Sequence, residues 1–357
     1  MISNPKLSVV MPAYNAGAYL RDAVSSILDQ SFRDFEFIIV NDGSSDATAS
    51  ILQEYERIDS RIRVFHQENQ GMIAALNRGC RLARGKYIAR MDADDISYPD
   101  RLAKQLTYLE AHPAIGILGT WVRKLKNDVP VEPWCPPTLP GVLRWELFFG
   151  VSVAHPSILM RRTIGERLGF YRADALHVED VDLWFRASAI TEFSNLPEIL
   201  YEYRVWHGGT SQMDQQIRRE THVRFLRDFI RYTFQIDVPL EAALGLRQTR
   251  VGPRCQDLRQ IRLTASLVRT LHKHFLEKND LSAKERREIS WDAAKRVASL
   301  ALQASRLDAG TSFSLFTQAL KLDYRLLAPS AIMRGLDRAI SDRMSQRLAV
   351  DSAPATR

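Results

Sequence analysis

Three carboxylates stand within four positions of one another, directly after an apolar run of the chain. Asp92, Asp94 and Asp95 would repel one another there, so they must share a cation, accept hydrogen bonds or lie solvated on a loop. Two carboxylates at positions i and i+2 can offer oxygens to one divalent cation, and Mg²⁺ or Mn²⁺ suits such an all-oxygen site. The alternative is that Asp95 or Ser97 caps the helix expected near Pro99, while the other acids are solvated.

Two other polar positions also follow predicted strands. Asp42 can accept the imide N–H of a uracil, or it is a turn residue beside Gly43. Tyr14 and Asn15 follow the first predicted strand, and the tyrosine ring either stacks on a nucleobase or packs over the sheet edge. The residues alone leave both alternatives open.

The acidic pair Glu179-Asp180 opens a predicted helix, where negative charge is favourable in any case. Its functional interpretation is that one of the two carboxylates acts as general base toward a hydroxyl group. His207 lies in a turn after a predicted strand, where it either ligates a metal or is an ordinary surface histidine. The same two interpretations apply to His155.

The spacing of apolar residues predicts the elements that position these side chains. We expect strands at 7–12, 35–40, 62–65 and 87–91, and helices at 18–30, from Ser44 or Ser45 to 57, and at 71–83. This alternation is typical of βαβ units with a parallel sheet covered on both faces. Ligands bind such sheets beyond the carboxyl ends of the strands. The polar clusters after the four strands therefore fall at one edge.

The pattern is less regular in the second part of the chain. Five prolines between 130 and 140 suggest an irregular excursion over the sheet edge in 121–150. We expect a strand at 157–161, a helix at 181–189, a strand at 199–205, and helices beyond 215 apart from a loop at 245–253. The predicted organisation is a domain at 1–214, divided into two parts at about residue 120, and a helical region at 215–357.

Composition supports an ordinary soluble protein. Of 357 residues, 45% are hydrophobic and 25% charged, and no apolar run approaches the roughly 18–20 residues of a membrane helix. Residues 1–6 carry no secretory signal, and the three cysteines Cys80, Cys135 and Cys255 are too scattered for a metal site or a disulfide framework. We therefore expect reduced thiols and a cytoplasmic location.

Charge divides the chain in two. Residues 215–357 hold 26 basic and 15 acidic side chains, whereas residues 1–214 hold 23 basic and 27 acidic ones. Arg334, Arg338, Arg343 and Arg347 stand at helical spacing, which predicts a basic amphipathic helix. This tail either attaches the protein peripherally to the cytoplasmic face of an anionic membrane or is a helical subdomain with homodimer contacts. Nucleic-acid binding is not expected, because no recognised module is present.

Several motifs occur together, in order and at characteristic spacing. They are Ser8–Asn15, Val40–Asp46, Asn69–Gly71 with Asn77–Gly79, Tyr87–Asp95, His155–Ser157, Glu179–Trp184 and Tyr203–His207. Over about residues 5–212 the sequence closely resembles the family 2 glycosyltransferases of GT-A fold. The resemblance implies a mostly parallel mixed sheet flanked by helices, followed here by the helical region. Within the sheet domain it implies a nucleotide-binding half at 1–120 and an acceptor half at 121–214. It also implies inverting sugar transfer from a nucleotide-diphosphate donor, usually a UDP-sugar, to an acceptor hydroxyl.

The resemblance assigns roles residue by residue. It implies donor contacts from Pro12, Ala13, Tyr14, Asn15, Asp42, Asn77, Asp92 and Ala93, with Tyr14 at the nucleobase and Asp42 on uracil. Asp92, Asp94 and His207 correspond to the positions that hold Mn²⁺ or Mg²⁺. Asp180 corresponds to the catalytic base. The positions near the acceptor, or supporting these residues, are Asp95, His155, Glu179 and Trp184.

The Gln-x-x-Arg-Trp motif of processive relatives is absent, which favours the addition of one or a few sugars. The expected acceptor is a glycan or a lipid-linked glycan, in cell-surface glycan or polysaccharide biosynthesis. Sugar-phosphate nucleotidyl transfer is one alternative. It is disfavoured because such enzymes have a glycine-rich loop with arginine after the first strand, and this chain has Ala13-Tyr14-Asn15-Ala16-Gly17 there. A dehydrogenase would show G-x-G-x-x-G there. The remaining alternative is a non-catalytic nucleotide-sugar-binding scaffold whose helical tail recruits partners.

Overall fold

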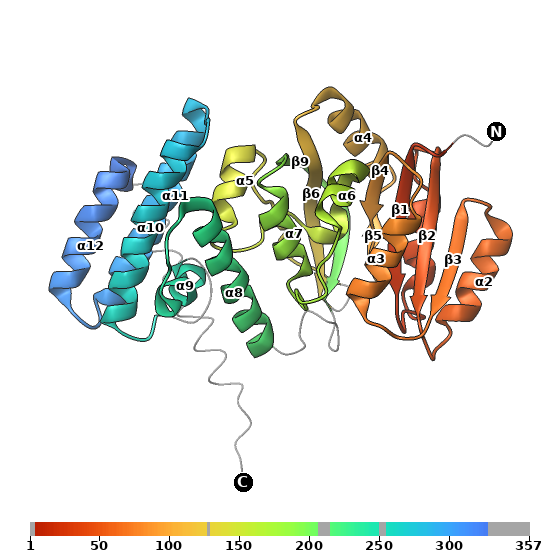
Figure 1. The fold of residues 1–357 in the computed structure, drawn as a ribbon, viewed down its shortest axis with the longest axis horizontal. Helices are drawn as coiled ribbons and strands as arrows, with labels where there is room; N and C mark the ends of the chain where they lie inside the picture. The colour runs from red at the N-terminus through yellow and green to blue at the C-terminus, as the bar shows by residue number, and fades with distance from the viewer. Residues whose placement is uncertain (1–3, 127–128, 206–214, 250–254, 328–357) are drawn as a thin grey trace, which may run out of the picture. The chain divides into compact units, whose positions relative to one another are not determined.

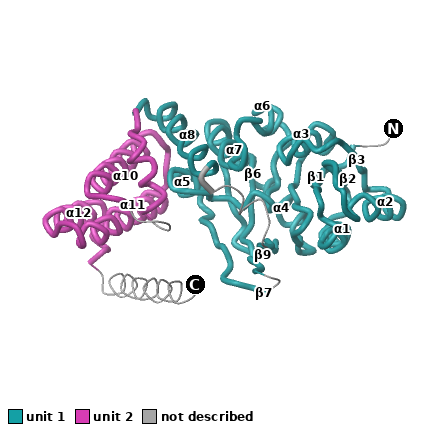
Figure 2. Tube along the Cα trace, turned by 90° about the horizontal axis from the view of Figure 1, so that it is seen from below, with its two compact units in different colours: residues 1–236 teal, residues 237–357 magenta. Residues whose placement is uncertain are grey.

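The computed structural model of the chain describes residues 4–126, 129–205, 215–249 and 255–327. It divides into two compact units, residues 1–236 and residues 237–357 (Figure 2). The sheet lies in unit 1. In the described part of unit 2, the regular elements are helices.

The first part of unit 1 alternates strands with helices (Figure 1). The parallel strands β1 (Leu7–Ala13), β2 (Phe35–Asp42), β3 (Ile62–Gln67) and β4 (Tyr87–Arg90) pair in the order β3-β2-β1-β4. The connecting helices are α1 (Leu20–Leu28), α2 (Thr48–Ile58) and α3 (Met72–Leu82). The predicted βαβ units are therefore confirmed.

Burial explains the sequence pattern of these elements. Every residue of β1 and of β2 is buried, as expected for strands covered on both faces. Helix α1 buries Leu20, Ala23, Val24 and Ile27, which lie on one face at 3.6 residues per turn. The chain leaves β1 toward β2 and β3 and then returns to place β4 on the other side of β1. In such sheets this change of direction opens a crevice at the carboxyl ends of β1 and β4.

Two expected helix caps are wrong. Ser44 and Ser45 lie in the loop before α2, and it is Asp46 Oδ1 that accepts a hydrogen bond from Thr48 N at 3.0 Å. Neither Asp95 nor Ser97 caps α4 (Arg101–Ala111), because the residue preceding that helix is Asp100 and its side chain makes no cap bond. Ser97 belongs instead to the short strand β5 (Ile96–Ser97).

The second part of unit 1 extends the sheet with strands of both directions. Strand β8 (Leu159–Arg161) runs antiparallel to β4 and to β6 (Ile115–Lys126), and β6 pairs in parallel with β9 (Glu192–Val205). β9 also pairs with β5, and β7 (Val129–Pro130) pairs with β6. The other elements are α5 (Pro140–Glu146), the 3₁₀ turn His155–Ser157, α6 (Arg162–Leu168) and α7 (Glu179–Ala187).

The sequence pattern missed much of this sheet. The start of the segment expected to be irregular is the second half of β6, and β9 begins at Glu192, seven residues before the expected strand. The β6–β9 pairing has register shifts between Ile115 and Ile117 and around Trp121. Such irregularities break the period-two alternation that identifies a strand. Beyond β7, the proline-rich stretch does follow an irregular path, with Trp134 bridging to Val122 of β6.

The described part of the tail is helical, as predicted. Helix α8 (Gln215–Phe234) belongs to unit 1, which ends at residue 236, whereas the expected helical region starts at 215. Unit 2 contains α9 (Leu240–Leu246), α10 (Leu258–Lys278), α11 (Ala283–Ala304) and α12 (Ala309–Leu322). Among the described helices none is both long and apolar enough to cross a membrane. The predicted basic helix around Arg334–Arg347 lies outside the described residues.

Candidate active site

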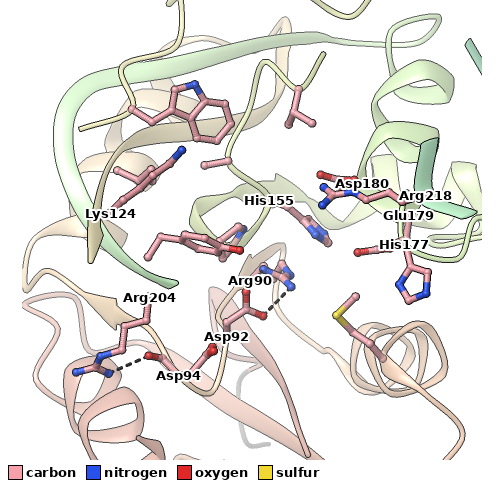
Figure 3. A pocket seen from close by; sticks show the side chains of 17 residues that line it. Arg90, Asp92, Asp94, Lys124, His155, His177, Glu179, Asp180, Arg204 and Arg218 are labelled. Atoms are coloured by element: carbon pink, nitrogen blue, oxygen red, sulfur yellow. Dashed lines mark hydrogen bonds and ion pairs between the residues drawn. The ribbon is translucent and has the colours of Figure 1, made fainter. Parts of the chain in front are cut away.

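A cavity of about 380 Å³ in unit 1 is lined by both parts of the sheet (Figure 3). The turn after β4 contributes Asp92 and Asp94, and the first turn of α7 contributes Glu179 and Asp180. The other lining residues are Met72, Arg90, Val122, Lys124, Trp134, Val151, Ala154, His155, Pro156, His177, Tyr203, Arg204 and Arg218. The structure thus brings together two acidic groups that lie almost 90 residues apart in sequence.

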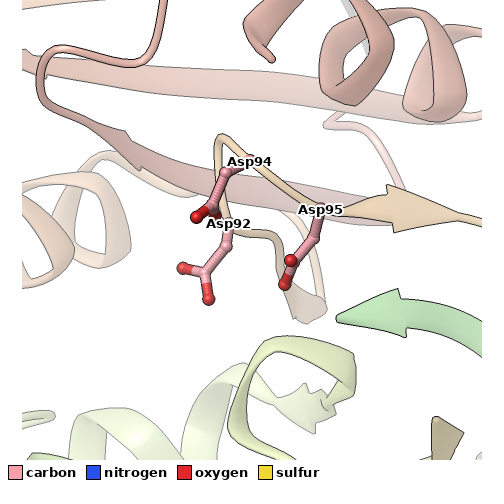
Figure 4. A group of neighbouring side chains, drawn as sticks. All are labelled: Asp92, Asp94 and Asp95. Atoms are coloured by element: carbon pink, nitrogen blue, oxygen red, sulfur yellow. The ribbon is translucent and has the colours of Figure 1, made fainter. Parts of the chain in front are cut away.

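The first acidic group is the turn Asp92–Asp95, called the acidic turn below. Asp92, Asp94 and Asp95 each offer a carboxylate oxygen, and these oxygens lie within 4.8 Å of one another (Figure 4). Asp92 and Asp94 line the cavity, whereas Asp95 is fully buried and accepts a hydrogen bond from Arg204 N at 2.8 Å. An all-oxygen set of this kind fits Mg²⁺ or Mn²⁺.

Arginines surround the acidic turn. Both carboxylate oxygens of Asp92 pair with Arg90, and Arg204 Nη1 donates to the backbone oxygen of Asp94 at 2.8 Å. Arg101 is buried and donates to the backbone oxygens of Arg90 and Pro156. These cations lower the cost of gathering three acids in one turn.

Despite these cations, Asp95 holds a proton more tightly than usual. Burial, followed by the charges of Asp92 and Asp94, raises the pKa of the Asp95 carboxyl well above its ordinary value. Burial also lowers the pKa of Arg101 to about 10. Of the two roles expected of Asp95, the helix cap is wrong, because its side chain accepts a hydrogen bond from Arg204 N instead. Its role in supporting Asp92 and Asp94 stays a prediction.

The second acidic group, Glu179 and Asp180, has a different environment. Asp180 lines the cavity and accepts a hydrogen bond from Val181 N at 2.8 Å. Burial, and then the charge of Asp180, raises the pKa of Glu179 to about 7. The pKa of Asp180 is also raised, chiefly by burial. A carboxylate with a raised pKa at a cavity wall is suited to accept a proton.

His155 lies in the 3₁₀ turn at the wall of the same cavity. Its Nε2 is 2.8 Å from the hydroxyl of Tyr171, and its ring stands edge-on to Trp184 at 5.8 Å between centroids. Burial, and then the charge of Arg90, lowers the pKa of His155 well below its ordinary value, so the ring is neutral. Trp184 is fully buried and does not line the cavity, so its ring packs against His155 behind the cavity wall.

The loop after β1 is tied to the loop after β2. Asn15 adopts a left-handed backbone conformation with φ 47°, and its Oδ1 accepts from Ser45 N at 2.9 Å. Ser44 Oγ in turn accepts from Asn15 N at 3.0 Å. Tyr14, the next residue back, is 54% exposed at the end of β1, so a ring face is available for stacking.

Three of the residues predicted to contact the donor, Pro12, Ala13 and Ala93, have buried side chains. Pro12 and Ala13 are the last residues of β1, and Ala93 lies between the two acids of the cavity wall. All three side chains are buried, which leaves only backbone groups at these positions to meet a donor. No side-chain selectivity is expected from them.

Asp42 anchors the loop that follows β3. Its carboxylate accepts hydrogen bonds from Gln67 Nε2 at 2.7 Å, Gln70 N at 2.9 Å and Gly71 N at 2.8 Å. The neighbouring Gly43 has φ +74°, and a Cβ there would lie 2.6 Å from Asn69 N. A carboxylate has about four lone-pair sites, so three bonds leave capacity for one more donor. The anchoring function was not predicted.

Asn77, which was predicted to contact the donor, is not among the residues that line the cavity. Its amide nitrogen donates to the Tyr171 backbone oxygen at 2.8 Å, and its oxygen accepts from Tyr171 N at 3.0 Å. The side chain therefore fixes the turn that carries Tyr171, the partner of His155. His207, the third predicted metal ligand, lies outside the described residues.

Several cavity residues were not predicted as site residues. Arg90 stands inside an apolar strand directly before the acidic turn, and a charge in such a run was an available signal. Arg218 lies on α8 and Trp134 in the proline-rich stretch, and neither position carries a pattern that points to this cavity. Only the folded chain brings them to it.

A mixed, mostly parallel sheet covered by helices, with acids at the carboxyl ends of its strands, is an α/β fold of the class that binds ligands at that edge. Residues 8–162 match the model of the glycosyl transferase family 2. An uncharacterized glycosyltransferase of Haemophilus influenzae is 32% identical over 239 residues, which cover 64% of this chain and 74% of that protein. The chain therefore belongs to glycosyl transferase family 2 and is a glycosyltransferase.

Two solved structures share the fold. S. aureus TarS 1–349 in complex with UDP-GlcNAc has a TM-score of 0.55 at 17% identity, covering 90% of this chain and 91% of that one. The mannosyltransferase PcManGT from Pyrobaculum calidifontis, in complex with GDP-Man and Mn²⁺, has a TM-score of 0.51 at 17% identity, covering 92% and 88%. At this identity the likeness establishes a GT-A-like architecture.

Proposed function

We propose that this glycosyltransferase moves a sugar from a nucleotide diphosphate to an acceptor hydroxyl by a single inverting displacement that needs a divalent cation. The observation that carries the proposal is that the acidic turn and the Glu179–Asp180 pair line one cavity. One group is suited to the charged leaving group of the donor, and the other to the proton of the acceptor.

The donor is best placed with its nucleobase at the ends of β1 and β2. The exposed ring of Tyr14 offers a stacking surface, and Asp42 has a remaining acceptor site for the imide N–H of uracil. A UDP-sugar is therefore the proposed donor. UDP-GlcNAc and GDP-Man in the two structural neighbours support a nucleotide sugar as the class of ligand.

The cation would be held by Asp92 and Asp94, which line the cavity, with Asp95 behind them. Mn²⁺ in the second structural neighbour supports this assignment. Bound there, Mn²⁺ or Mg²⁺ supplies positive charge that stabilises the diphosphate as the bond from the anomeric carbon to its oxygen breaks. His207 stays a predicted further ligand.

Asp180 is the proposed base. The acceptor oxygen attacks the anomeric carbon while its proton passes to the Asp180 carboxylate, and the diphosphate leaves with the electron pair of the broken bond. His155 beside the pair is neutral, and the positive charges near the two carboxylates, those of Arg90 and Arg218, only partly offset the effect of burial on their pKa values. A single attack from one side inverts the anomeric centre.

The acceptor is proposed to be a sugar hydroxyl of a glycan or lipid-linked glycan in cell-surface polysaccharide assembly. Trp134 and Val122 give the cavity an apolar patch that suits the carbon face of a sugar ring. The basic tail offers a route to an anionic membrane surface, and the protein would then act at the cytoplasmic face.

The test is a screen of UDP- and GDP-sugars for hydrolysis or transfer, with Mn²⁺, with Mg²⁺ and with EDTA. We expect release of nucleoside diphosphate from one donor, loss of activity with EDTA, and recovery when Mn²⁺ is restored. Activity that survives EDTA would contradict the cation requirement, and no turnover or binding of any donor would contradict the proposed reaction.

A further inference from the structure

Arg90 stands between the two acidic groups and touches only one of them. Its Nη1 is 2.8 Å from Asp92 Oδ2, and its Nη2 is 2.6 Å from Asp92 Oδ1. Two parallel N–H···O bonds of this kind are among the strongest polar contacts that side chains make. Both oxygens of the first acid of the acidic turn are therefore already in use.

The guanidinium is also buried. Arg90 is 4% exposed, and its Nε has no hydrogen-bond partner among the described residues. A buried arginine that loses its carboxylate pays the cost of an unpaired charge, which is larger than the gain from the pair itself. Arg90 can therefore release Asp92 only if another anion takes its N–H groups.

A divalent cation at Asp92 would share that carboxylate with the guanidinium. Two positive groups on one carboxylate repel each other, and a cation that takes an oxygen fully must displace a donor of Arg90. Arg90 lines the cavity in which the donor diphosphate is expected, so phosphate oxygens can reach the displaced N–H groups. A diphosphate bound in this cavity would then be attracted by both the cation and the guanidinium.

We propose that Arg90 couples the binding of the two ligands. Its ion pair with Asp92 weakens the binding of a cation alone, and its N–H groups bind the diphosphate instead when the cation and the nucleotide bind together. The inference rests on the proposed function and adds a positioning residue to it. Coupling of this kind is reciprocal, so the cation strengthens nucleotide binding by the same factor. Free cation would bind weakly, and the site would form only with donor present.

The experiment measures the affinity of the full-length protein for Mn²⁺ by electron paramagnetic resonance, alone and with saturating UDP or GDP. A titration without protein corrects for the complex between Mn²⁺ and the nucleotide. In the unmodified protein we expect nucleotide to tighten Mn²⁺ binding by about tenfold or more. In Arg90→Met we expect Mn²⁺ alone to bind more tightly than before, and the tightening by nucleotide to fall at least about fivefold.

Arg63→Met is the matched control, because Arg63 also pairs with a buried carboxylate, that of Glu36 at 2.6 Å, and does not line the cavity. It should leave the tightening unchanged. If Arg90→Met does not fold, Arg90→Lys decides, since one ammonium cannot hold both oxygens as a guanidinium does and should lose at least about half of the tightening.

An unchanged tightening in the folded Arg90 variant, or weaker binding of Mn²⁺ alone in Arg90→Met, would overturn the inference. So would an unmodified protein that binds Mn²⁺ and nucleotide without mutual strengthening, and in that case the proposed reaction still stands if transfer is observed. A protein that binds neither nucleotide in the presence of Mn²⁺ contradicts the proposed function itself.

Discussion

The two acidic groups of the cavity are held in different ways. At the acidic turn, Asp92 is paired through both oxygens with Arg90, and Arg204 and Arg101 lie close by. At the start of α7, Glu179 and Asp180 are buried beside one another, and their pKa values are raised chiefly by burial. Asp92 is held in an ion pair, whereas burial biases Glu179 and Asp180 toward a proton.

The difference separates two chemical tasks. Carboxylates that stay charged are ligands for a cation, because a metal must displace any bound proton. A carboxylate whose pKa lies nearer to neutral accepts a proton more readily during a reaction. In the proposed reaction, one wall of the cavity would therefore stabilise the departing diphosphate and the other would deprotonate the acceptor. Each of the following predictions tests one side of this division.

The largest effect is expected at Asp180. Asp180→Asn removes the proton acceptor but keeps the size of the side chain, so transfer should fall by about 100- to 10,000-fold. Donor affinity, measured by calorimetry with Mn²⁺ and a nucleotide sugar, should stay within about threefold, because the base acts on the acceptor. A variant that loses donor binding to the same extent would show that Asp180 belongs to the donor site.

The next effect is expected at Asp94. Asp94→Asn removes a charged oxygen from the acidic turn, and Mn²⁺ affinity in the presence of UDP should fall by about 10- to 100-fold. Asp174→Asn is the control, because Asp174 pairs with Arg172 and does not line the cavity. Equal Mn²⁺ affinity in the two variants would remove Asp94 from the cation site.

Glu179 tests the proton side through stability. Its pKa of about 7 in the folded protein exceeds the ordinary value of 4.5, so the folded state holds this proton more tightly than the unfolded state does. The free energy of unfolding should therefore fall as the pH rises from about 4.5 to 7. Glu179→Gln should remove this contribution, so its effect on the free energy of unfolding should be more favourable at pH 8 than at pH 4.5 by on the order of 3 kcal/mol.

Urea unfolding of both proteins at pH 4.5 and pH 8 measures the difference, in which the carboxyl groups that do not interact with Glu179 cancel. A difference that does not change with pH would mean that the pKa of Glu179 is the same in the folded and the unfolded protein.

The smallest effect is expected at Asp95. Asp95→Asn retains the oxygen that accepts from Arg204 N, and the carboxyl it replaces already has a raised pKa. Mn²⁺ affinity should therefore change by less than about threefold, in contrast to Asp94→Asn. A loss as large as that of Asp94→Asn, measured in the same titration, would make Asp95 a direct ligand.

Local sequence patterns were sufficient to predict the part of the site that is built from the βαβ units. β1, β2 and β4 are mainly apolar, and the polar residues after them had to fall at one edge of a parallel sheet. The second part of the sheet was only partly predictable. Pairing of β6 with β9 joins residues about 75 positions apart and contains register shifts, and neither property leaves a local pattern.

By itself, the sequence determined the family, the parallel sheet and the identity of both acidic groups, because each depends on residue types at short, fixed spacing. Only the tertiary structure decided how those groups are compensated. It buried Asp95, placed Asn77 on the Tyr171 backbone, and put Arg90 on Asp92 while leaving Glu179 and Asp180 in a region of raised pKa. Burial and ion pairing depend on which distant side chains meet, and that is set by packing.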